Sequence, residues 1–212
     1  MKAVYRSIKP YWLYLILIGK KTIEVGKTFP KAADWNKEVF LHCSKDMKSF
    51  KRIPEKDREW MRKYLGKVAC RFVCRRIDTI GKRGINNNFD YCYQSLNVFG
   101  NDDIEVEITA IQKSCISKVE LNAYGATSMR LYAWHISNLV IYDKPRELSE
   151  FYTLKKCDAC KGGYESSACI YDEDCRVPTL ITRPPQSWQY AEVSEYKKYR
   201  VIISDNEESE EE

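Results

Sequence analysis

The sequence predicts an α+β fold, a small mixed β-barrel with short flanking helices. Segments with the period-two alternation and the β-branched content of strands outnumber the helical segments. The helical segments are short and serve mostly as connections. A chain of 212 residues with 44% hydrophobic content can bury one sizeable core and an elaboration. We expect one domain over residues 1–204, with a cysteine-rich insertion at 153–182 and a disordered acidic tail at 205–212.

The chain begins with a predicted strand, Lys2 to Ile8, and a predicted short helix, Pro10 to Ile18. Proline suits a first helical position, and Gly19 suits the left-handed residue that ends a helix. This helix is apolar on all sides, so it is either covered by the rest of the fold or offers a patch to a protein partner. Its apolar run is far shorter than the ~20 residues that cross a bilayer. We expect a cytoplasmic protein with neither a signal peptide nor a membrane span.

The stretch from Gly19 to Lys27 is the best candidate for a site. Side chains alternate along the predicted strand Thr22 to Val25, so Glu24 shares a polar face with Thr22. One interpretation places Lys21 and Glu24 at the mouth of a pocket where the helix meets the sheet. The alternative is a solvated strand edge whose charges prevent aggregation.

The remaining elements are mostly strands. In chain order the pattern predicts a strand at Glu38 to His42, a helix at Pro54 to Leu65, a strand at Gly66 to Arg75, and a long loop or small insertion at Gly81 to Asp103. A strand at Glu105 to Ile111 follows, and then a helix that opens with a capping box at Ser117 and closes at Gly125. The last predicted elements are a strand at Leu131 to Ile136 with another after Asn138, a short helix at Pro145 to Phe151, and a last strand that follows Thr182 to Tyr190.

The charge distribution favours an anionic partner. Residues 1–204 hold 35 bases against 24 acids, a formal charge of +11, because six acids lie in the last eight residues. Residues 45–76 carry twelve bases and four acids, with Trp60 and Tyr64 among them. This pattern is typical of a surface that binds a nucleic-acid backbone and stacks on bases; a plain solvated helix face is the alternative. The candidate phosphate-binding residues are Lys51, Arg52, Lys56, Arg58, Arg62 and Lys63.

Nine cysteines without a secretion signal argue for reduced thiols or a metal. Cys157, Cys160, Cys169 and Cys175 follow the spacing C-x2-C-x8-C-x5-C in a polar segment. Four thiolates around a tight turn fit a structural zinc site, which would order a segment that burial cannot hold. Unpaired loop thiols are the alternative. The other five, Cys43, Cys70, Cys74, Cys92 and Cys115, are interpreted as small core residues.

Three motifs resemble the ASCH domain, a branch of the PUA-like β-barrels, and the resemblance covers most of residues 1–195. They are Gly19-Lys20-Lys21-Thr22-Ile23-Glu24, then Tyr132 to Leu139, and Pro184-Pro185-Gln186-Ser187-Trp188. The phage and Firmicute members that insert a cysteine-bearing segment are the most similar. The resemblance implies a barrel with a cleft lined by a G-x-K-x-x-E-x-R motif, into which Lys21 and Glu24 face. This chain has Gly26 where the motif has arginine, and the neighbouring Lys27 lacks the planar guanidinium.

These observations lead to three hypotheses. The first is a nucleic-acid binding module that recognises RNA or a modified nucleoside in the cleft. The second is a hydrolase that acts on a modified nucleoside, of the amidohydrolase type, or a ribonuclease, with Lys21 and Glu24 as the catalytic pair. The third is an adaptor that binds a protein through the apolar first helix. The candidate ligand-binding residues are Lys21, Thr22, Glu24, Lys27, Trp134, His135, Gln186, Ser187 and Trp188.

Overall fold

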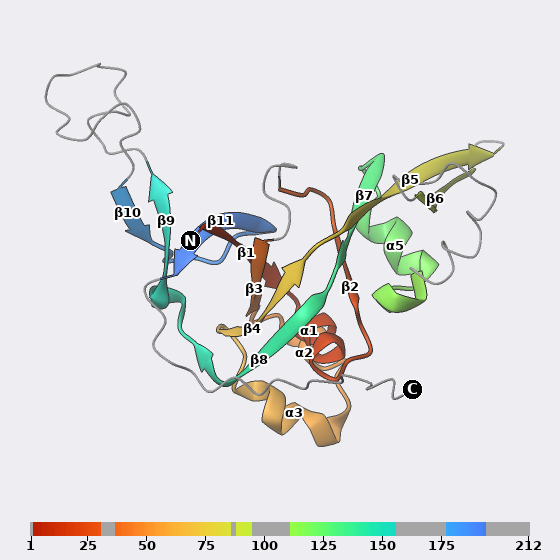
Figure 1. Ribbon diagram of the computed structural model, residues 1–212. Coiled ribbons are helices and arrows are strands. Elements are labelled where there is room, and N and C mark those ends of the chain that lie inside the picture. Colours follow the sequence, from red (N-terminus) through yellow and green to blue (C-terminus); the bar gives the residue numbers. More distant parts are fainter. Residues whose placement is uncertain (1, 31–36, 86–87, 95–110, 156–176, 194–212) are drawn as a thin grey trace, which may run out of the picture.

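A computed structural model describes residues 2–30, 37–85, 88–94, 111–155 and 177–193. Its strands form a seven-stranded sheet in the order β10-β9-β11-β1-β3-β4-β8 and a four-stranded sheet in the order β2-β7-β5-β6 (Figure 1). In the larger sheet β1 is parallel to β3, and the other neighbours are antiparallel. The α+β class is confirmed. Among the described residues the strands form two sheets rather than a closed barrel.

The bounds of the elements agree with most of the predicted segments. The strands of the larger sheet are β1 (Lys2–Ile8), β3 (Lys37–Cys43), β4 (Val68–Cys74), β8 (Ser137–Arg146), β9 (Phe151–Lys155), β10 (Val177–Leu180) and β11 (Trp188–Val193). Those of the smaller sheet are β2 (Ile23–Gly26), β5 (Ile77–Ile85), β6 (Asn88–Gln94) and β7 (Arg130–His135). The helices are α1 (Pro10–Leu17), α2 (Met47–Phe50), α3 (Glu55–Arg62) and α5 (Lys118–Tyr124), with a 3-10 turn η2 (Leu148–Glu150).

The two sheets meet where one strand follows another almost without a break. β4 leads into β5, and β7 leads into β8, so each of these chain segments passes from one sheet to the other (Figure 1). The hydroxyl of Ser137 donates to the carbonyl of Val73 at 2.6 Å, and the His135 amide donates to the carbonyl of Arg76 at 3.0 Å. These bonds satisfy backbone groups at the bend, where the ladders are interrupted. The sequence predicted one sheet closed into a barrel, and the structure instead has two sheets joined at this bend.

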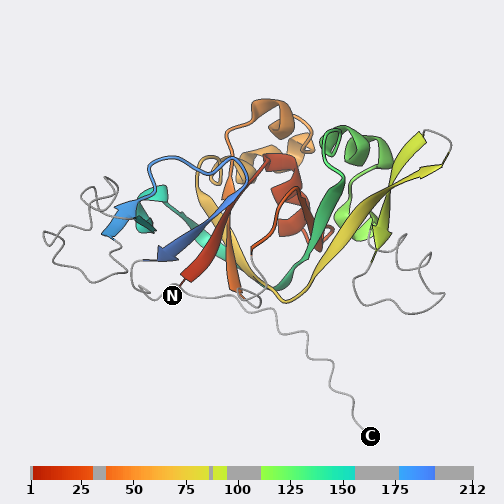
Figure 2. The ribbon, with the colours of Figure 1, turned by 90° about the horizontal axis from the view of Figure 1, so that it is seen from above.

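The apolar first helix is covered. α1 lies in the middle of the molecule, with the seven-stranded sheet on one side and β7, β5 and α5 on the other (Figure 2). Leu13, Tyr14, Leu15 and Ile16 are buried in the largest core cluster. Gly19 ends the helix with φ +75°, as predicted. Most of its apolar surface is therefore inside the core, while Tyr11, Trp12 and Leu17 remain partly exposed, so the protein partner of the third hypothesis stays a prediction.

Two other predicted segments differ. Residues predicted as a loop from Gly81 onward instead form the β5–β6 hairpin, although Phe89, Tyr91 and Tyr93 alternate along β6. The helix predicted at Pro145 to Phe151 shrinks to η2, because β8 continues through Pro145 to Arg146. Pro145 is compatible with this continuation because β8 is the outermost strand of its sheet. The predicted strand Glu105 to Ile111 lies almost wholly outside the described residues, as does the tail at 205–212.

The cysteine-rich insertion is bounded by two strands that the sequence pattern did not reveal. β9 and β10 pair antiparallel, from Val177 opposite Lys155 to Leu180 opposite Tyr152. The segment between these strands contains all four candidate zinc ligands and lies outside the described residues. No helix within the described ranges is long and apolar enough to cross a membrane.

Candidate functional site

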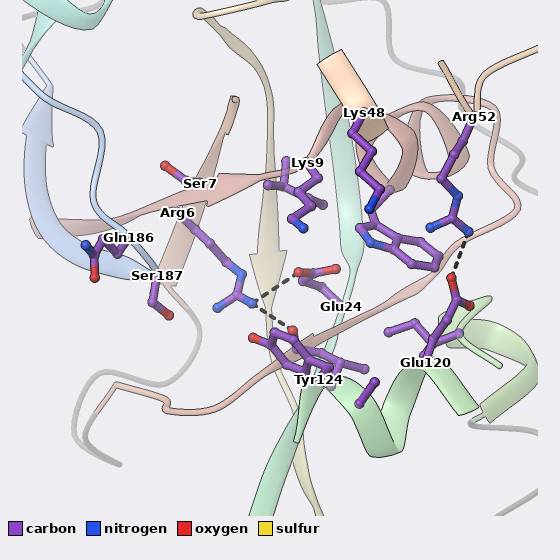
Figure 3. A pocket seen from close by; sticks show the side chains of 15 residues that line it. Arg6, Ser7, Lys9, Glu24, Lys48, Arg52, Glu120, Tyr124, Gln186 and Ser187 are labelled. Atoms are coloured by element: carbon purple, nitrogen blue, oxygen red, sulfur yellow. Dashed lines mark hydrogen bonds and ion pairs between the residues drawn. The ribbon is translucent and has the colours of Figure 1, made fainter. Parts of the chain in front are cut away.

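A pocket of about 590 Å³ opens between the two sheets, beside α1, α2 and α5 (Figure 3). Its wall is built by residues from six parts of the chain: β1 and the residue after it, α1, β2, α2 with the turn that follows, α5 with the segment just before it, and the loop before β11. Lys9, Lys48 and Arg52 lie along the upper side in Figure 3, Gln186 and Ser187 lie to the left, and Tyr124 lies below.

Arg6 forms the buried charged part of this wall. β1 is a central strand, with Val4 and Ile8 in one core cluster and Tyr5 in another on the opposite face. Alternation places Arg6 on the same face as Val4 and Ile8, so its guanidinium is only 3% exposed. Its Nη2 donates to Glu24 Oε1 at 3.1 Å and to the carbonyl of Val25 at 2.9 Å. Its Nη1 and Nε are enclosed and make no hydrogen bond of normal geometry among the described residues, but the guanidinium also interacts with the hydroxyl of Tyr124.

Gly26 provides the space that this guanidinium occupies. A Cβ atom at Gly26 would lie 2.9 Å from Arg6 Nη1 and 3.1 Å from Trp134 Nε1. Such distances are shorter than normal van der Waals contact, so the guanidinium fits only because residue 26 has no side chain. The sequence analysis noted an arginine missing at position 26. The structure shows a guanidinium beside that position, contributed by Arg6 from another strand.

Lys21 and Glu24 lie together, but only Glu24 reaches the pocket. Lys21 Nζ is 3.3 Å from Glu24 Oε2 and donates to the carbonyl of Ser114 at 2.7 Å. The Lys21 residue is 1% exposed and Glu24 is 7% exposed. Burial lowers the pKa of Lys21, and the Glu24 carboxylate opposes this shift. The pair is therefore inside the fold rather than on a solvated strand edge, while Thr22 is exposed.

The rim of the pocket carries most of its cations. Arg52 pairs with Glu120 at 2.8 Å and lies over the ring of Tyr11, with Cζ 4.0 Å from the ring centroid. Lys9 lies 3.5 Å from Asp46, with its side chain largely exposed. Lys48 forms no ion pair within the described part of the chain. The guanidinium of Arg52 and the ammonium groups of Lys9 and Lys48 thus line the opening.

The motif that ends at Trp188 contributes two residues to the pocket wall and one to the packing beneath it. Gln186 and Ser187 line the pocket. Trp188 donates its indole N–H to Thr28 Oγ1 at 2.8 Å and packs against Trp134, with ring centroids 6.4 Å apart. Trp134 is 0% exposed and lies under Arg6, whose Cζ is 4.9 Å from the ring centroid. In this arrangement the Trp134 ring supports the guanidinium and does not face solvent.

His135 and Lys27 lie outside the pocket wall. His135 Nε2 is 2.8 Å from Asp78 Oδ2, and Asp78 also accepts from Arg76 Nε at 2.8 Å. This cluster holds the bend between the sheets, and a structural role accounts for it. Lys27 lies over the ring of Tyr124, with Nζ 5.2 Å from the centroid. Its ammonium therefore contacts a residue of the pocket wall from outside.

Several of the candidate phosphate-binding residues at 51–63 make contacts within the protein. Arg58 donates to the carbonyls of Ile53 and Lys51, both at 2.9 Å, so it holds the turn before α3. Arg62 pairs with Glu59 at 3.4 Å, and Lys63 donates to the carbonyl of Asp143 at 3.4 Å. Lys51 and Lys56 are exposed. Tyr64 is buried, so its ring is not available for stacking, whereas Trp60 is exposed.

Several residues of the site were not predicted from the sequence, among them Arg6, Lys9, Lys48 and Tyr124. Arg6 had a readable signal, because both faces of Lys2 to Ile8 carry apolar residues and a central strand buries both faces. A charged residue within such a strand is expected to be buried with a partner. The other three had no signal in the pattern, since only the fold brings α2 and α5 to β1.

The four candidate zinc ligands lie outside the described residues. No group of His, Cys, Asp or Glu that could hold a metal ion occurs in the described ranges. Cys43, Cys70 and Cys74 are buried in the largest core cluster, as predicted. Cys115 is only partly buried against that cluster, and its thiol donates to the carbonyl of Lys20.

Comparisons with known proteins give one kind of match. No family model matches the chain, and no curated protein matches it. Several solved structures are similar to it. These structural neighbours are ASCH proteins. ASCH from Zymomonas mobilis has 12% sequence identity and a TM-score of 0.45, over 89% of this chain and 86% of that chain. Two mutant ZmASCH proteins have the same TM-score, with 13% and 12% identity, over 90% and 89% of this chain and 90% and 87% of theirs. The phage and Firmicute subtype of ASCH remains a prediction.

The arrangement is suited to binding. The pocket combines a buried guanidinium with unused N–H groups, a carboxylate that can accept further hydrogen bonds, and cations at the rim. Trp12, Val25 and Tyr124 add apolar surface. An anionic ligand with a planar, partly apolar body fits this chemistry.

Proposed function

We propose that this protein binds a nucleotide unit of single-stranded nucleic acid, RNA above all, in the pocket beside Arg6. The observation that carries the proposal is a buried guanidinium in the pocket wall, with two nitrogens that make no hydrogen bond of normal geometry among the described residues and whose neighbour is the Tyr124 hydroxyl. A buried cation is costly unless its donors are satisfied, so this group favours a ligand that offers acceptor oxygens. The volume, about 590 Å³, lies in the range of small-ligand sites.

The pocket offers separate surfaces for the parts of a nucleotide. The indole of Trp12 and the ring of Tyr124 provide aromatic contacts for a base or a ribose. Gln186, Ser187 and Glu24 provide polar groups for a base edge. Duplex bases are not accessible to such a pocket, so the ligand is expected to be single-stranded or flipped out. The motif resemblance to ASCH domains, which are thought to bind RNA or modified nucleosides, supports the choice of RNA.

The geometry supports binding more than hydrolysis. A lysine with a lowered pKa is a reasonable general base or nucleophile. However, Lys21 Nζ already contacts Ser114 and Glu24 and is not part of the pocket wall. A ligand in the pocket would meet Glu24 and Arg6 first. The nearby lysine is better explained as the buried ion-pair partner of Glu24.

Fluorescence anisotropy with short labelled oligonucleotides tests the proposal. We expect single-stranded RNA to bind more tightly than duplex RNA of the same sequence, and affinity to fall as salt rises from about 50 to about 200 mM. Lys48→Met and Lys9→Met should each weaken binding a few-fold, because each removes a cation from the pocket rim. Binding to single-stranded DNA in parallel measures the preference for RNA.

The matched control is Lys144→Met, which removes an exposed cation of β8 that is not part of the pocket wall. This variant should bind as the parent protein does. Equal losses in all three variants would assign binding to general charge and not to the pocket. Undetectable binding of every oligonucleotide at low salt would reject the proposed function.

A further inference from the structure

We infer that the pocket takes a terminal phosphate, so that the ligand it prefers is a nucleotide or an RNA end that carries a phosphomonoester. The inference rests on the proposed function and deepens it, because it states which part of the nucleic acid enters the site. It follows from the balance of charges in the pocket, from the unused donors of Arg6, and from the depth at which those donors lie.

The charges beside the pocket do not balance. Glu24 is a single carboxylate shared by two cations, since Arg6 Nη2 is 3.1 Å from Oε1 and Lys21 Nζ is 3.3 Å from Oε2. Arg52 and Glu120 neutralise each other at 2.8 Å. Lys48 has no ion pair within the described part of the chain. Two positive charges therefore remain without a carboxylate of their own, one in the buried cluster and one at the rim.

This excess matches the charge of a phosphomonoester. A monoester with a second pKa near 6 carries about two negative charges at pH 7. An internal phosphodiester carries one, and a nucleoside carries none. Since Coulomb interactions are stronger in a partly buried site than in water, a difference of one ligand charge has a large effect on affinity there. The pocket should therefore bind RNA ends with a phosphate more tightly than ends with a hydroxyl.

The donor geometry at Arg6 supports the same ligand. A guanidinium has five N–H groups, and Nη2 uses its two on Glu24 and on the Val25 carbonyl. Nη1 and Nε make no hydrogen bond of normal geometry among the described residues, although the Tyr124 hydroxyl interacts with the guanidinium. Both nitrogens are enclosed, so a phosphate oxygen reaches them only when the Tyr124 ring or the guanidinium shifts. Figure 3 shows the guanidinium between Glu24 and Tyr124, with Ser187 nearby. A phosphate has several acceptor oxygens on one atom, so it can bind Arg6 and a rim ammonium together.

The depth of Arg6 favours a chain end over an internal phosphate. Arg6 is 3% exposed, and Tyr124 lies beside it in the pocket wall. An internal phosphodiester has a nucleotide on both sides, and both neighbours would have to enter the pocket with it. A terminal phosphate has only one. The apolar wall formed by Trp12 and Ala123 remains for the attached ribose and base.

Competition and direct binding test this inference. Fluorescence anisotropy would compare RNAs of one sequence with a 5′-phosphate, a 3′-phosphate or hydroxyl groups at both ends. Unlabelled nucleoside 5′- and 3′-monophosphates, the matching nucleosides and inorganic phosphate would be the competitors. We expect one phosphorylated end to bind at least tenfold more tightly than the hydroxyl ends, and its monophosphate to compete where the nucleoside does not. Competition by inorganic phosphate as strong as by the monophosphate would assign the site to free phosphate and overturn the inference.

Variants show whether a cation of the pocket matters more than an equal charge elsewhere on the surface. Lys48→Met should reduce the advantage of the phosphorylated end several-fold, whereas Lys144→Met should leave it unchanged. Arg6→Met should abolish the advantage, and its circular dichroism spectrum and thermal transition would show whether the fold is retained. Should Arg6→Met unfold the protein, Lys48→Met still gives a decision.

The two proposals fail in different ways. If all three RNAs bind equally well, the inference is wrong and the proposed function stands. If no RNA binds but a nucleoside monophosphate does, the terminal-phosphate site stands and the proposed RNA function is wrong. If neither binds, both are wrong.

Discussion

The guanidinium of Arg6 occupies the space that a side chain at Gly26 would need. Arg6 belongs to β1 in the seven-stranded sheet, and Gly26 ends β2 in the four-stranded sheet. A Cβ at Gly26 would lie 2.9 Å from Nη1 and 3.1 Å from Nη2 of Arg6. The two residues therefore depend on each other although they are twenty positions apart in the chain and lie on different sheets.

Gly26→Ala should destabilise the protein and weaken ligand binding. The added methyl group would displace the Arg6 guanidinium or the Trp134 indole, and overpacking of this kind costs about 1–3 kcal/mol. Urea unfolding would measure the loss. In an Arg6→Met background the same alanine should cost less, because the guanidinium is gone, and the double-mutant cycle should give a coupling of about 1 kcal/mol. Additive losses would show that the two residues do not compete for space.

The three members of the buried charge cluster should differ in their effect on stability. Glu24→Gln removes the only carboxylate between Arg6 and Lys21 and leaves two buried cations together. Breaking such a group costs about 3–5 kcal/mol. Arg6→Met or Lys21→Met leaves one balanced pair and should cost less. Chemical unfolding of the three variants tests this order. A Glu24→Gln protein as stable as Arg6→Met would show that the cluster is not held by its charges.

The free energy of unfolding should fall as the pH rises above about 9. Burial raises the pKa of Cys74 to about 11 and that of Cys43 to about 12, and it also raises the pKa of Cys70. These thiols stay protonated in the folded state while the unfolded chain loses its protons around pH 9.0, so stability that is present below that pH is lost above it. The loss is about 1.4 kcal/mol per pH unit for each thiol.

Urea unfolding between pH 7 and pH 10 measures this slope. Cys43→Ala and Cys74→Ala should each make it shallower. Val68→Ala, which removes a buried side chain without a titrating group, should lower stability by a similar amount at every pH and keep the slope. A slope that the cysteine variants leave unchanged would contradict the assignment.

The four cysteines of the insertion should hold one zinc ion. We propose this site from their spacing, since thiolates at this spacing suit a closed tetrahedral structural site. Elemental analysis of the purified protein should find about one zinc per chain, and a chelator should remove it. Cys157→Ala with Cys160→Ala should lose the metal, while Cys115→Ala should keep it. Metal-free protein purified in the presence of zinc would reject the site.

The sequence pattern predicted elements well where local chemistry decides the structure. Gly19 ends α1 in the left-handed conformation, and Ser117 with Glu120 forms the capping box that opens α5. The pattern did not predict the second half of β5, because glycines and charged residues interrupt its alternation. This strand pairs with β7 on one side and β6 on the other. Tertiary pairing stabilises that strand more than local propensity does.

The candidate site was predicted in part. Lys21, Glu24, Gln186 and Ser187 come from motifs that the sequence shows, although Lys21 lies behind the pocket wall rather than in it. Arg6 could have been found, since a charge in a strand with two apolar faces requires a buried partner. The rim residues Lys9 and Lys48 could not, because their position depends on how the loops after β1 and β3 approach α5.

The bend at which β4 leads into β5 and β7 leads into β8 has a mechanical consequence. The two strands that line the pocket, β1 and β2, belong to different sheets, and the ion pair between Arg6 and Glu24 connects them. A ligand oxygen that binds the Arg6 guanidinium would compete with Glu24 for it. Binding of a ligand would therefore change the contact that joins the two sheets at the pocket.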